Sequence, residues 1–117
     1  MFHEIRTRVV DYYADARGRR PFRDWWKALR DNQARNRIRV RLDRMELGHF
    51  GDCRSVGVGV FELKVDVGPG YRVYFGLLRN EVILLLCGGD KSSQEKDIRR
   101  AQSFWLDYRR RLHGKEA

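Results

Sequence analysis

The sequence has little of what metal sites, disulfide frameworks and membrane spans require. Its two cysteines and three histidines are scattered, without the close spacing typical of zinc ligands. The longest apolar run, 82–87, is far too short to cross a bilayer, and the first residues do not resemble a signal peptide. There is no P-loop, dinucleotide fingerprint, internal repeat or low-complexity segment. We therefore expect a reduced, cytoplasmic protein with no metal, cofactor or membrane partner.

What the sequence does contain is enough apolar material for one core. Its 117 residues are 42% hydrophobic and 12% aromatic, which predicts a folded chain despite 35% charged residues. This length fits a single domain spanning 1–117. Cys87 lies inside an apolar run and is interpreted as a small buried hydrophobe.

Acidic residues are scarce beside the basic ones. The chain has 25 Lys and Arg against 16 Asp and Glu, which gives a formal net charge of +9. Only five of the cations are Lys, so twenty are Arg. Because the planar guanidinium suits two-pronged contact with phosphate, the composition favours a polyanionic partner, above all RNA.

The basic residues concentrate in the segment 17–44, which holds eleven Lys and Arg and only three acids. Such a one-signed excess predicts a surface that follows nucleic-acid phosphates. The ordinary alternative is a solvated helix face. The arginines of this segment predicted to bind nucleic acid are Arg35, Arg37, Arg39 and Arg41.

Hydrophobic periodicity predicts an α+β domain with helices on one face of a twisted sheet. The expected elements are a strand within 2–12, a helix from Pro21, a helix over 33–47, strands within 53–67, 71–77 and 82–87, and a last helix. A capping box of Ser92 with Glu95 marks the start of that last helix, and its basic tail from Arg109 is expected to fray. Tight turns predict antiparallel pairing of the later strands. The three tryptophans, at helical spacing, are interpreted as core.

Isolated cations stand at the expected rim of the sheet. Lys64 and Arg72 lie on the polar sides of two strands joined by a Gly-Pro-Gly turn, and Lys91 follows a Gly-Gly corner. Such cations would bind a phosphodiester and stabilise the charge it gains during cleavage by the 2′-hydroxyl of RNA, a reaction that needs no metal. Tyr74 shares the strand face of Arg72 and is predicted to stack on a nucleotide. The alternative is ordinary cross-strand pairing with neighbouring acids, Glu62 and Asp66.

The sequence is less informative about a general base. None of the later predicted strands, within 53–87, contains a histidine. Lys64, beside another cation, is the candidate base. Asp90 and Asp97 near the glycine corner are further candidates, or they simply cap and pair.

Three segments resemble the addiction-module killer proteins, the HigB-like branch of the RelE/ParE toxin superfamily. They are GDCRSVGVGVFELK (51–64), GPGYRVYF (68–75) and LLCGGDKSSQ (85–94). The likeness extends over roughly residues 20–105 and includes the segments 25–29 and 37–47. By position, Arg72 matches the family's central-strand arginine, Lys64 a sheet lysine, and Lys91 a further arginine. The chain departs from the pattern at Glu62, where a second sheet lysine is expected, and near Asp97, where a late tyrosine is expected.

The resemblance implies a RelE-like fold: an N-terminal strand, a helical hairpin, an antiparallel sheet of three or four further strands, and a C-terminal helix. It also implies the toxin of a type II toxin–antitoxin module, an endoribonuclease that cleaves mRNA on the ribosome and is held inactive by a helix-turn-helix, HigA-like antitoxin. On this basis Lys64, Arg72 and Lys91 are the predicted catalytic residues, and Arg54, within the first segment, joins the predicted RNA-binding set. The alternatives are a ParE-like inhibitor of DNA gyrase and a nucleic-acid-binding domain without toxicity.

Overall fold

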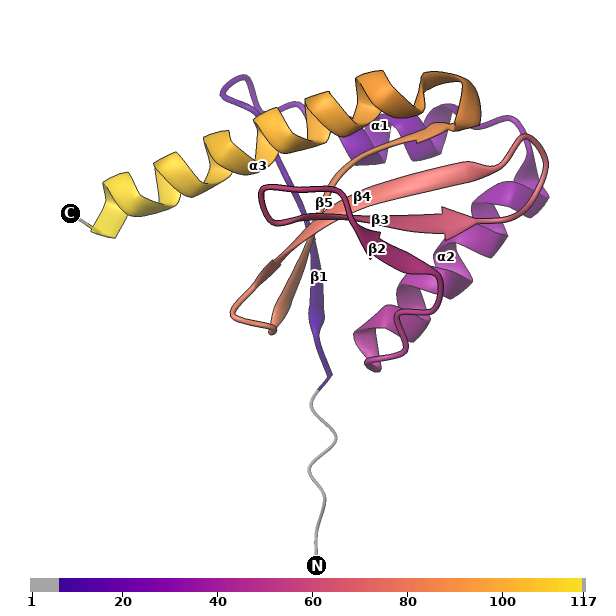
Figure 1. Ribbon diagram of the computed structural model, residues 1–117, viewed down its shortest axis with the longest axis horizontal. Coiled ribbons are helices and arrows are strands. Elements are labelled where there is room, and N and C mark those ends of the chain that lie inside the picture. The colour runs from indigo at the N-terminus through magenta and orange to yellow at the C-terminus, as the bar shows by residue number, and fades with distance from the viewer. Residues whose placement is uncertain (1–6, 117) are drawn as a thin grey trace, which may run out of the picture.

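The computed structural model describes residues 7–116, which form a five-stranded sheet and three α-helices (Figure 1). In chain order the elements are β1 (Val9–Tyr12), α1 (Pro21–Ala28), α2 (Asn32–Glu46), β2 (Cys53–Ser55), β3 (Val60–Val65), β4 (Tyr71–Leu78), β5 (Val82–Asp90), a 3-10 turn (Lys91–Ser93) and α3 (Gln94–Glu116). The strands lie in the order β1-β5-β4-β3-β2, with β1 parallel to β5 and the other pairs antiparallel. The α+β class, the antiparallel later strands and the C-terminal helix are confirmed, although the whole sheet is mixed.

The two helices of the N-terminal half begin where local chemistry predicts. Pro21 opens α1, where its missing N–H leaves no helical hydrogen bond unmade. Asp31 caps α2, because its side chain accepts a hydrogen bond from the backbone N–H of Ala34 at 3.1 Å. The predicted first strand is confirmed for Val9–Tyr12, and its residues 2–6 lie outside the described part of the chain.

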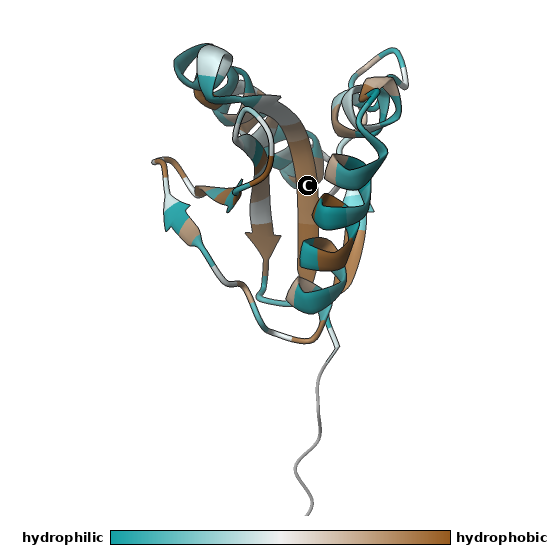
Figure 2. Cartoon of the chain, turned by 90° about the vertical axis from the view of Figure 1, so that its right-hand side faces the viewer, coloured by the Kyte–Doolittle hydropathy of each residue, from teal (hydrophilic) through white to brown (hydrophobic). Residues whose placement is uncertain are grey.

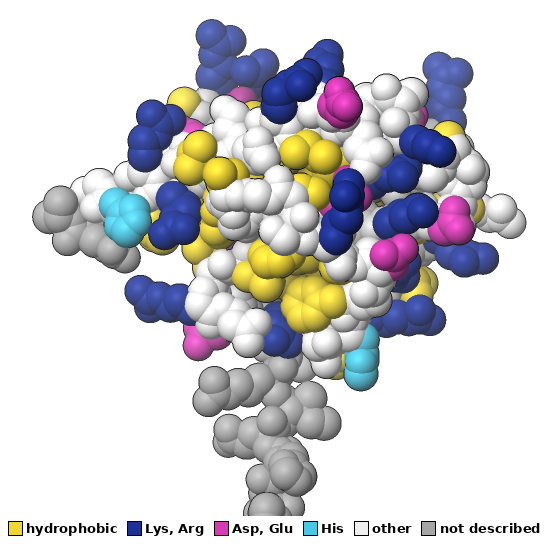
Figure 3. Space-filling model, in the orientation of Figure 1, with side chains coloured by type: hydrophobic (Ala, Val, Ile, Leu, Met, Phe, Trp, Pro, Cys, Tyr) yellow, Lys and Arg dark blue, Asp and Glu magenta, His cyan; other side chains and the backbone are white. Residues whose placement is uncertain are grey.

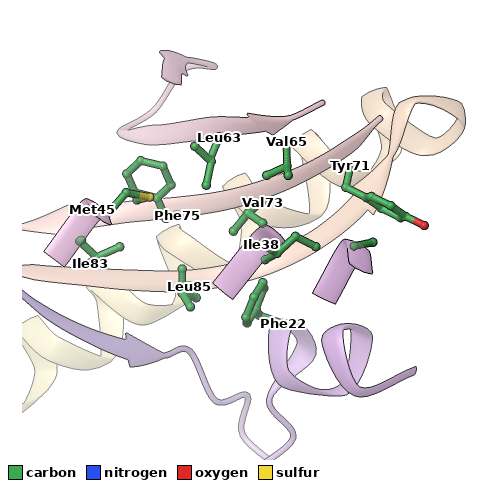
Figure 4. Close-up of a cluster of buried hydrophobic side chains, with 11 residues drawn as sticks. Phe22, Ile38, Met45, Leu63, Val65, Tyr71, Val73, Phe75, Ile83 and Leu85 are labelled. Carbon is green, nitrogen blue, oxygen red and sulfur yellow. The ribbon is translucent and has the colours of Figure 1, made fainter. Parts of the chain in front are cut away.

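The prediction that the helices share one face of the sheet is wrong. Helices α1 and α2 pack on one face, whereas α3 packs on the other, and Figure 2 shows the hydrophobic strands between them. The reason is visible in β5, whose successive leucines are buried on both sides, so that each face needs its own cover. The side chains of the first cluster, drawn in Figure 4, come from α1, α2, β3, β4 and β5.

The second cluster lies under α3. There Trp105 and Ala101 pack against Leu84, Leu86 and Cys87. Trp105 is buried as predicted, and Gly76 makes room for it, since a Cβ at that position would lie 2.2 Å from the indole ring. Cys87 is buried too, and burial raises the pKa of its thiol to about 12.

The glycine pair after the apolar run of β5 is not a corner. The strand continues through Gly88 and Gly89 to Asp90. A Cβ on Gly88 would lie 2.3 Å from the ring of Trp25 in α1, and a Cβ on Gly89 would lie 1.8 Å from the carboxylate of Asp97 in α3. The two glycines therefore let a helix approach each face of the strand.

The start and end of α3 also differ from prediction. In place of a capping box of Ser92 with Glu95, the side chain of Asp90 accepts a hydrogen bond from the backbone N–H of Ser92 at 2.8 Å. A 3-10 turn follows before α3 begins at Gln94. The helix then continues to Glu116, through the tail that was expected to fray.

Candidate active site

A hollow of about 260 Å³ opens over the polar end of the sheet, on the face that α3 covers. It is lined by Asp52, Arg54, Glu62, Lys64, Arg72 and Gln94. Strand pairing brings these side chains together, since Lys64 is the Cα partner of Arg72, and Glu62 is the partner of both Arg54 and Tyr74. Gln94 enters from the first residue of α3. Two of the three predicted catalytic residues, Lys64 and Arg72, thus meet in one hollow.

Arg72 is the buried cation of the hollow. The residue is only 6% exposed, and its Nη1 donates a hydrogen bond of 2.7 Å to the carbonyl of Gly70. Gly70 has a φ of +82°, and a Cβ there would lie 3.0 Å from the same Nη1, so the turn needs glycine at this position. Within the described residues, Nε of Arg72 has no hydrogen-bond partner and the guanidinium forms no ion pair. A buried cation left in this state favours binding of an anion.

Lys64 stands beside Arg72 with its side chain exposed. The ordinary alternative was that Lys64 and Arg72 form cross-strand ion pairs with Glu62 and Asp66, and the structure does not show such pairs within residues 7–116. Among the residues the structure describes, neither Lys64 nor Arg72 forms an ion pair with those acids. The pair therefore presents two positive charges to the hollow.

Glu62 is the buried carboxylate of the hollow, with 3% of the residue exposed. It accepts hydrogen bonds from Arg54 Nε at 2.9 Å, Tyr74 Oη at 3.0 Å and Gln94 Nε2 at 3.0 Å. Burial alone would raise the pKa of Glu62, but these three hydrogen bonds outweigh it and hold the pKa below its ordinary range. Glu62 is therefore ionised at neutral pH and fully engaged by its neighbours.

Lys91, the third predicted catalytic residue, lies outside this hollow. It is exposed at the start of the 3-10 turn and lines a neighbouring hollow with Ser92, Ser93 and Gln94, among others. Gln94 lines both hollows. Lys91 thus lines a separate hollow, which shares only Gln94 with the one that holds Lys64 and Arg72.

The placement of Tyr74 argues against its predicted stacking role. The side chain does share the strand face of Arg72, but the residue is 0% exposed and its hydroxyl donates to Glu62. Burial raises the pKa of Tyr74 far above its ordinary value, and the charge of Glu62 adds to this shift. A buried ring offers no free face to a base, so here Tyr74 supports the floor of the site.

The arginines of α2 form a separate basic surface, because α2 packs on the opposite face of the sheet. Arg37 and Arg39 are exposed, and Arg35 lies over the ring of Trp26 at 5.8 Å. Arg41 bonds to the sheet, where its Nη1 donates to the backbone carbonyl of Lys64 at 3.0 Å, but it does not line the hollow. Figure 3 shows that basic side chains greatly outnumber acidic ones on the face that it draws.

The two candidate aspartates take structural positions. Asp90 caps the 3-10 turn, and the hydrogen bonds from Ser92 lower its pKa, with a smaller contribution from the charge of Arg72. Asp97 is buried beneath Gly89, where it accepts a hydrogen bond from Ser93 and forms an ion pair of 3.5 Å with Arg100. Their interpretation as capping and pairing residues is confirmed.

Three lining residues were absent from the predicted site: Asp52, Glu62 and Gln94. The alternation of β3 places Glu62 on the same side as Lys64, a signal that was available in the sequence. Nothing local indicates Gln94, because its place depends on how α3 packs. Within residues 7–116 there is no group of three or more metal-ligating side chains, and none of the helices described there is long and apolar enough to cross a membrane.

Comparison with known proteins identifies a relative of this chain. An uncharacterized protein of Haemophilus influenzae is 46% identical to this chain over 81 residues, which make up 69% of the chain and 82% of that protein. No family model matches the sequence.

Proposed function

We propose that this chain, which belongs to the same family as the uncharacterized Haemophilus influenzae protein, is the toxin of a type II toxin–antitoxin module. In this proposal it is a metal-independent endoribonuclease that cleaves mRNA on the ribosome. The observation that carries the proposal is the Lys64–Arg72 pair at the wall of a hollow. One of these cations is exposed and one is buried, and neither forms an ion pair among the described residues. The resemblance of the segments 51–64, 68–75 and 85–94 to RelE/ParE toxins supports it.

The chemistry that fits this hollow is attack of a ribose 2′-oxygen on the adjacent phosphorus. The 2′-hydroxyl loses its proton, the bond to the 5′-oxygen breaks, and that oxygen takes up a proton, leaving a 2′,3′-cyclic phosphate and a 5′-hydroxyl. The phosphoryl oxygens gain negative charge on the way, and Arg72 with Lys64 would stabilise it. None of the six lining residues is a histidine, and Lys64 is the candidate base. In that role it accepts the 2′-proton as a neutral amine and becomes the cation that stands beside the phosphoryl oxygens.

The proposal is tested with purified protein, ribosomes programmed with a defined mRNA, and mapping of the cleaved ends. We expect cuts at codon boundaries, growth arrest on expression, and rescue by a helix-turn-helix antitoxin encoded beside the gene. Arg72→Ala should slow cleavage by about 10²–10³-fold, the loss usual for one charge-stabilising donor. The matched control is Arg110→Ala, because Arg110 is exposed and lies sixteen residues beyond Gln94 along α3, about 24 Å away. Unchanged cleavage by a folded Arg72→Ala would contradict the site.

A second candidate function has its own supporting observation, which is that the hollow holds cations but no histidine to move protons. A cationic site without a histidine suits a ParE-like inhibitor that acts on DNA gyrase by binding alone. Induction of the DNA-damage response with intact mRNA would favour this function. Steeply salt-dependent RNA binding with no growth phenotype would indicate a nucleic-acid-binding domain without toxicity.

A further inference from the structure

We propose that Arg54 is the third phosphate-binding cation of the hollow and that Glu62 is the positioning residue that aims it. This inference rests on the proposed function for its substrate class, a single-stranded RNA. Arg54 stands on the short strand β2 directly opposite Glu62 on β3. The hollow therefore takes its cations from three consecutive strands, Arg54 from β2, Lys64 from β3 and Arg72 from β4.

The guanidinium of Arg54 is held at one end and open at the other. Its Nε donates to Oε1 of Glu62 at 2.9 Å. Within the described part of the chain, the two Nη atoms make neither a hydrogen bond nor an ion pair, and the side chain is 61% exposed. Because the guanidinium is planar, fixing Nε fixes the plane in which both Nη atoms point. The free edge of that plane is the part that can contact a phosphate.

The carboxylate of Glu62 is itself held firmly in place. Its side chain is only 4% exposed, and its second oxygen, Oε2, accepts from both Tyr74 and Gln94. Those two donors come from β4 and from α3, so the carboxylate is held by the core and not by the surface. An exposed arginine on a three-residue edge strand would otherwise sample many rotamers. The buried carboxylate removes that freedom before the substrate arrives.

The competing explanation is that the Arg54–Glu62 pair only joins β2 to β3. A structural role accounts for the contact between Nε of Arg54 and Oε1 of Glu62. It does not account for the hollow that the pair lines, where Lys64 and Arg72 bring the cations to three against two acids, Asp52 and Glu62. The two explanations predict different kinetics.

The experiment compares Arg54→Ala, Arg54→Lys and Glu62→Gln with the unaltered chain and with Arg110→Ala. For each protein we would measure kcat and KM for ribosome-bound mRNA, and the Kd for a short single-stranded RNA carrying a 2′-deoxy nucleotide at the cleavage site. Arg54→Ala should lower kcat/KM about 10²-fold. Arg54→Lys, which keeps the charge but not the planar fork, should recover only part of that loss.

Glu62→Gln separates positioning from charge. It removes one negative charge from the hollow, so an effect of charge alone would tighten RNA binding and leave kcat unchanged or higher. A positioning role predicts instead that kcat falls about tenfold while RNA binding is no weaker than in the unaltered chain. The double variant Arg54→Ala, Glu62→Gln should cleave no more slowly than Arg54→Ala alone, because the two residues act as one unit.

Four results would overturn the inference. They are full kcat/KM in Arg54→Ala, full rescue by Arg54→Lys, an unchanged or higher kcat in Glu62→Gln, and additive losses in the double variant. If Glu62→Gln does not fold, the exposed Arg54→Lys still decides the point. If the unaltered chain cleaves no RNA, the proposed function fails, and the Kd measurements then test the site by itself. A higher Kd for RNA in Arg54→Ala supports the site, and an unchanged Kd rejects it.

Discussion

The face of the sheet under α1 and α2 is apolar along its length, whereas the face under α3 is apolar at one end and polar at the other. Along β4 the first face carries Tyr71, Val73 and Phe75, all in one cluster. The second face carries Arg72, then Tyr74, then a glycine that receives Trp105. The first face thus contributes only to the core, whereas the second face contributes to both the core and the site.

This division explains how a small domain can bury a cation. At the apolar end of the second face, Trp105 and Ala101 fix α3 against Leu84 and Leu86. At the polar end of the same helix, Gln94 donates a hydrogen bond to Glu62 on β3, and the carboxylate of Asp97 lies against Gly89 of β5. The helix is therefore anchored at some distance from the hollow that it closes.

The largest expected effect on stability comes from truncating one buried side chain on each face, at adjacent residues of β5. Leu85 and Leu86 are both 0% exposed, and they point into the first and second clusters respectively. We expect Leu85→Ala and Leu86→Ala each to lower the free energy of unfolding by about 2–5 kcal/mol, measured by urea denaturation. A loss under about 1 kcal/mol for Leu86→Ala would show that the second face is not a core at this point.

At the polar end of the second face, replacing Arg72 is expected to change the stability by a smaller amount and in the opposite direction. Arg72 is buried, and its charge has no ion-pair partner among the described residues. Arg72→Met should therefore keep the free energy of unfolding or raise it by about 1 kcal/mol, while slowing cleavage by about 10²–10³-fold. Thermal unfolding and the ribosome assay together check this. A marked drop in melting temperature would mean that Arg72 supports the fold and not only the site.

The smallest expected effect is on how the free energy of unfolding changes in acid. Because the pKa of Glu62 lies below its ordinary value of 4.5 in the folded chain, its hydrogen bonds stabilise the fold above pH 4.5, and this contribution is lost as the pH falls through the folded-state pKa. Glu62→Gln has no charge to lose, so its stability should fall less steeply between pH 5 and pH 3. Asp15, Asp90 and Asp107, whose pKa values are also lowered, supply the slope that remains in both proteins. Parallel slopes would show that folding does not lower the pKa of Glu62.

Local chemistry accounts for much of what was predicted correctly. A proline at the first turn, an acid at the cap and an apolar stripe are enough to define α1 and α2, since each acts within a few residues. The alternation of β3 and β4 likewise placed Lys64 and Arg72 on the same side of a hairpin. The errors have a common cause, which is that they concern contacts between distant segments. Gly88 and Gly89 signal a turn by composition, yet they serve the approach of two helices.

The sequence by itself determined the helices and strands, the excess of arginine, and the two cations that alternate onto one side of the hairpin, because periodicity and charge are carried by neighbouring residues. Tertiary structure alone decided that α3 crosses to the second face, that Arg54 and Gln94 converge on Glu62, and that Lys91 and Tyr74 take other positions. Those outcomes depend on which surfaces remain unburied once the central strands have paired, and no local pattern encodes that.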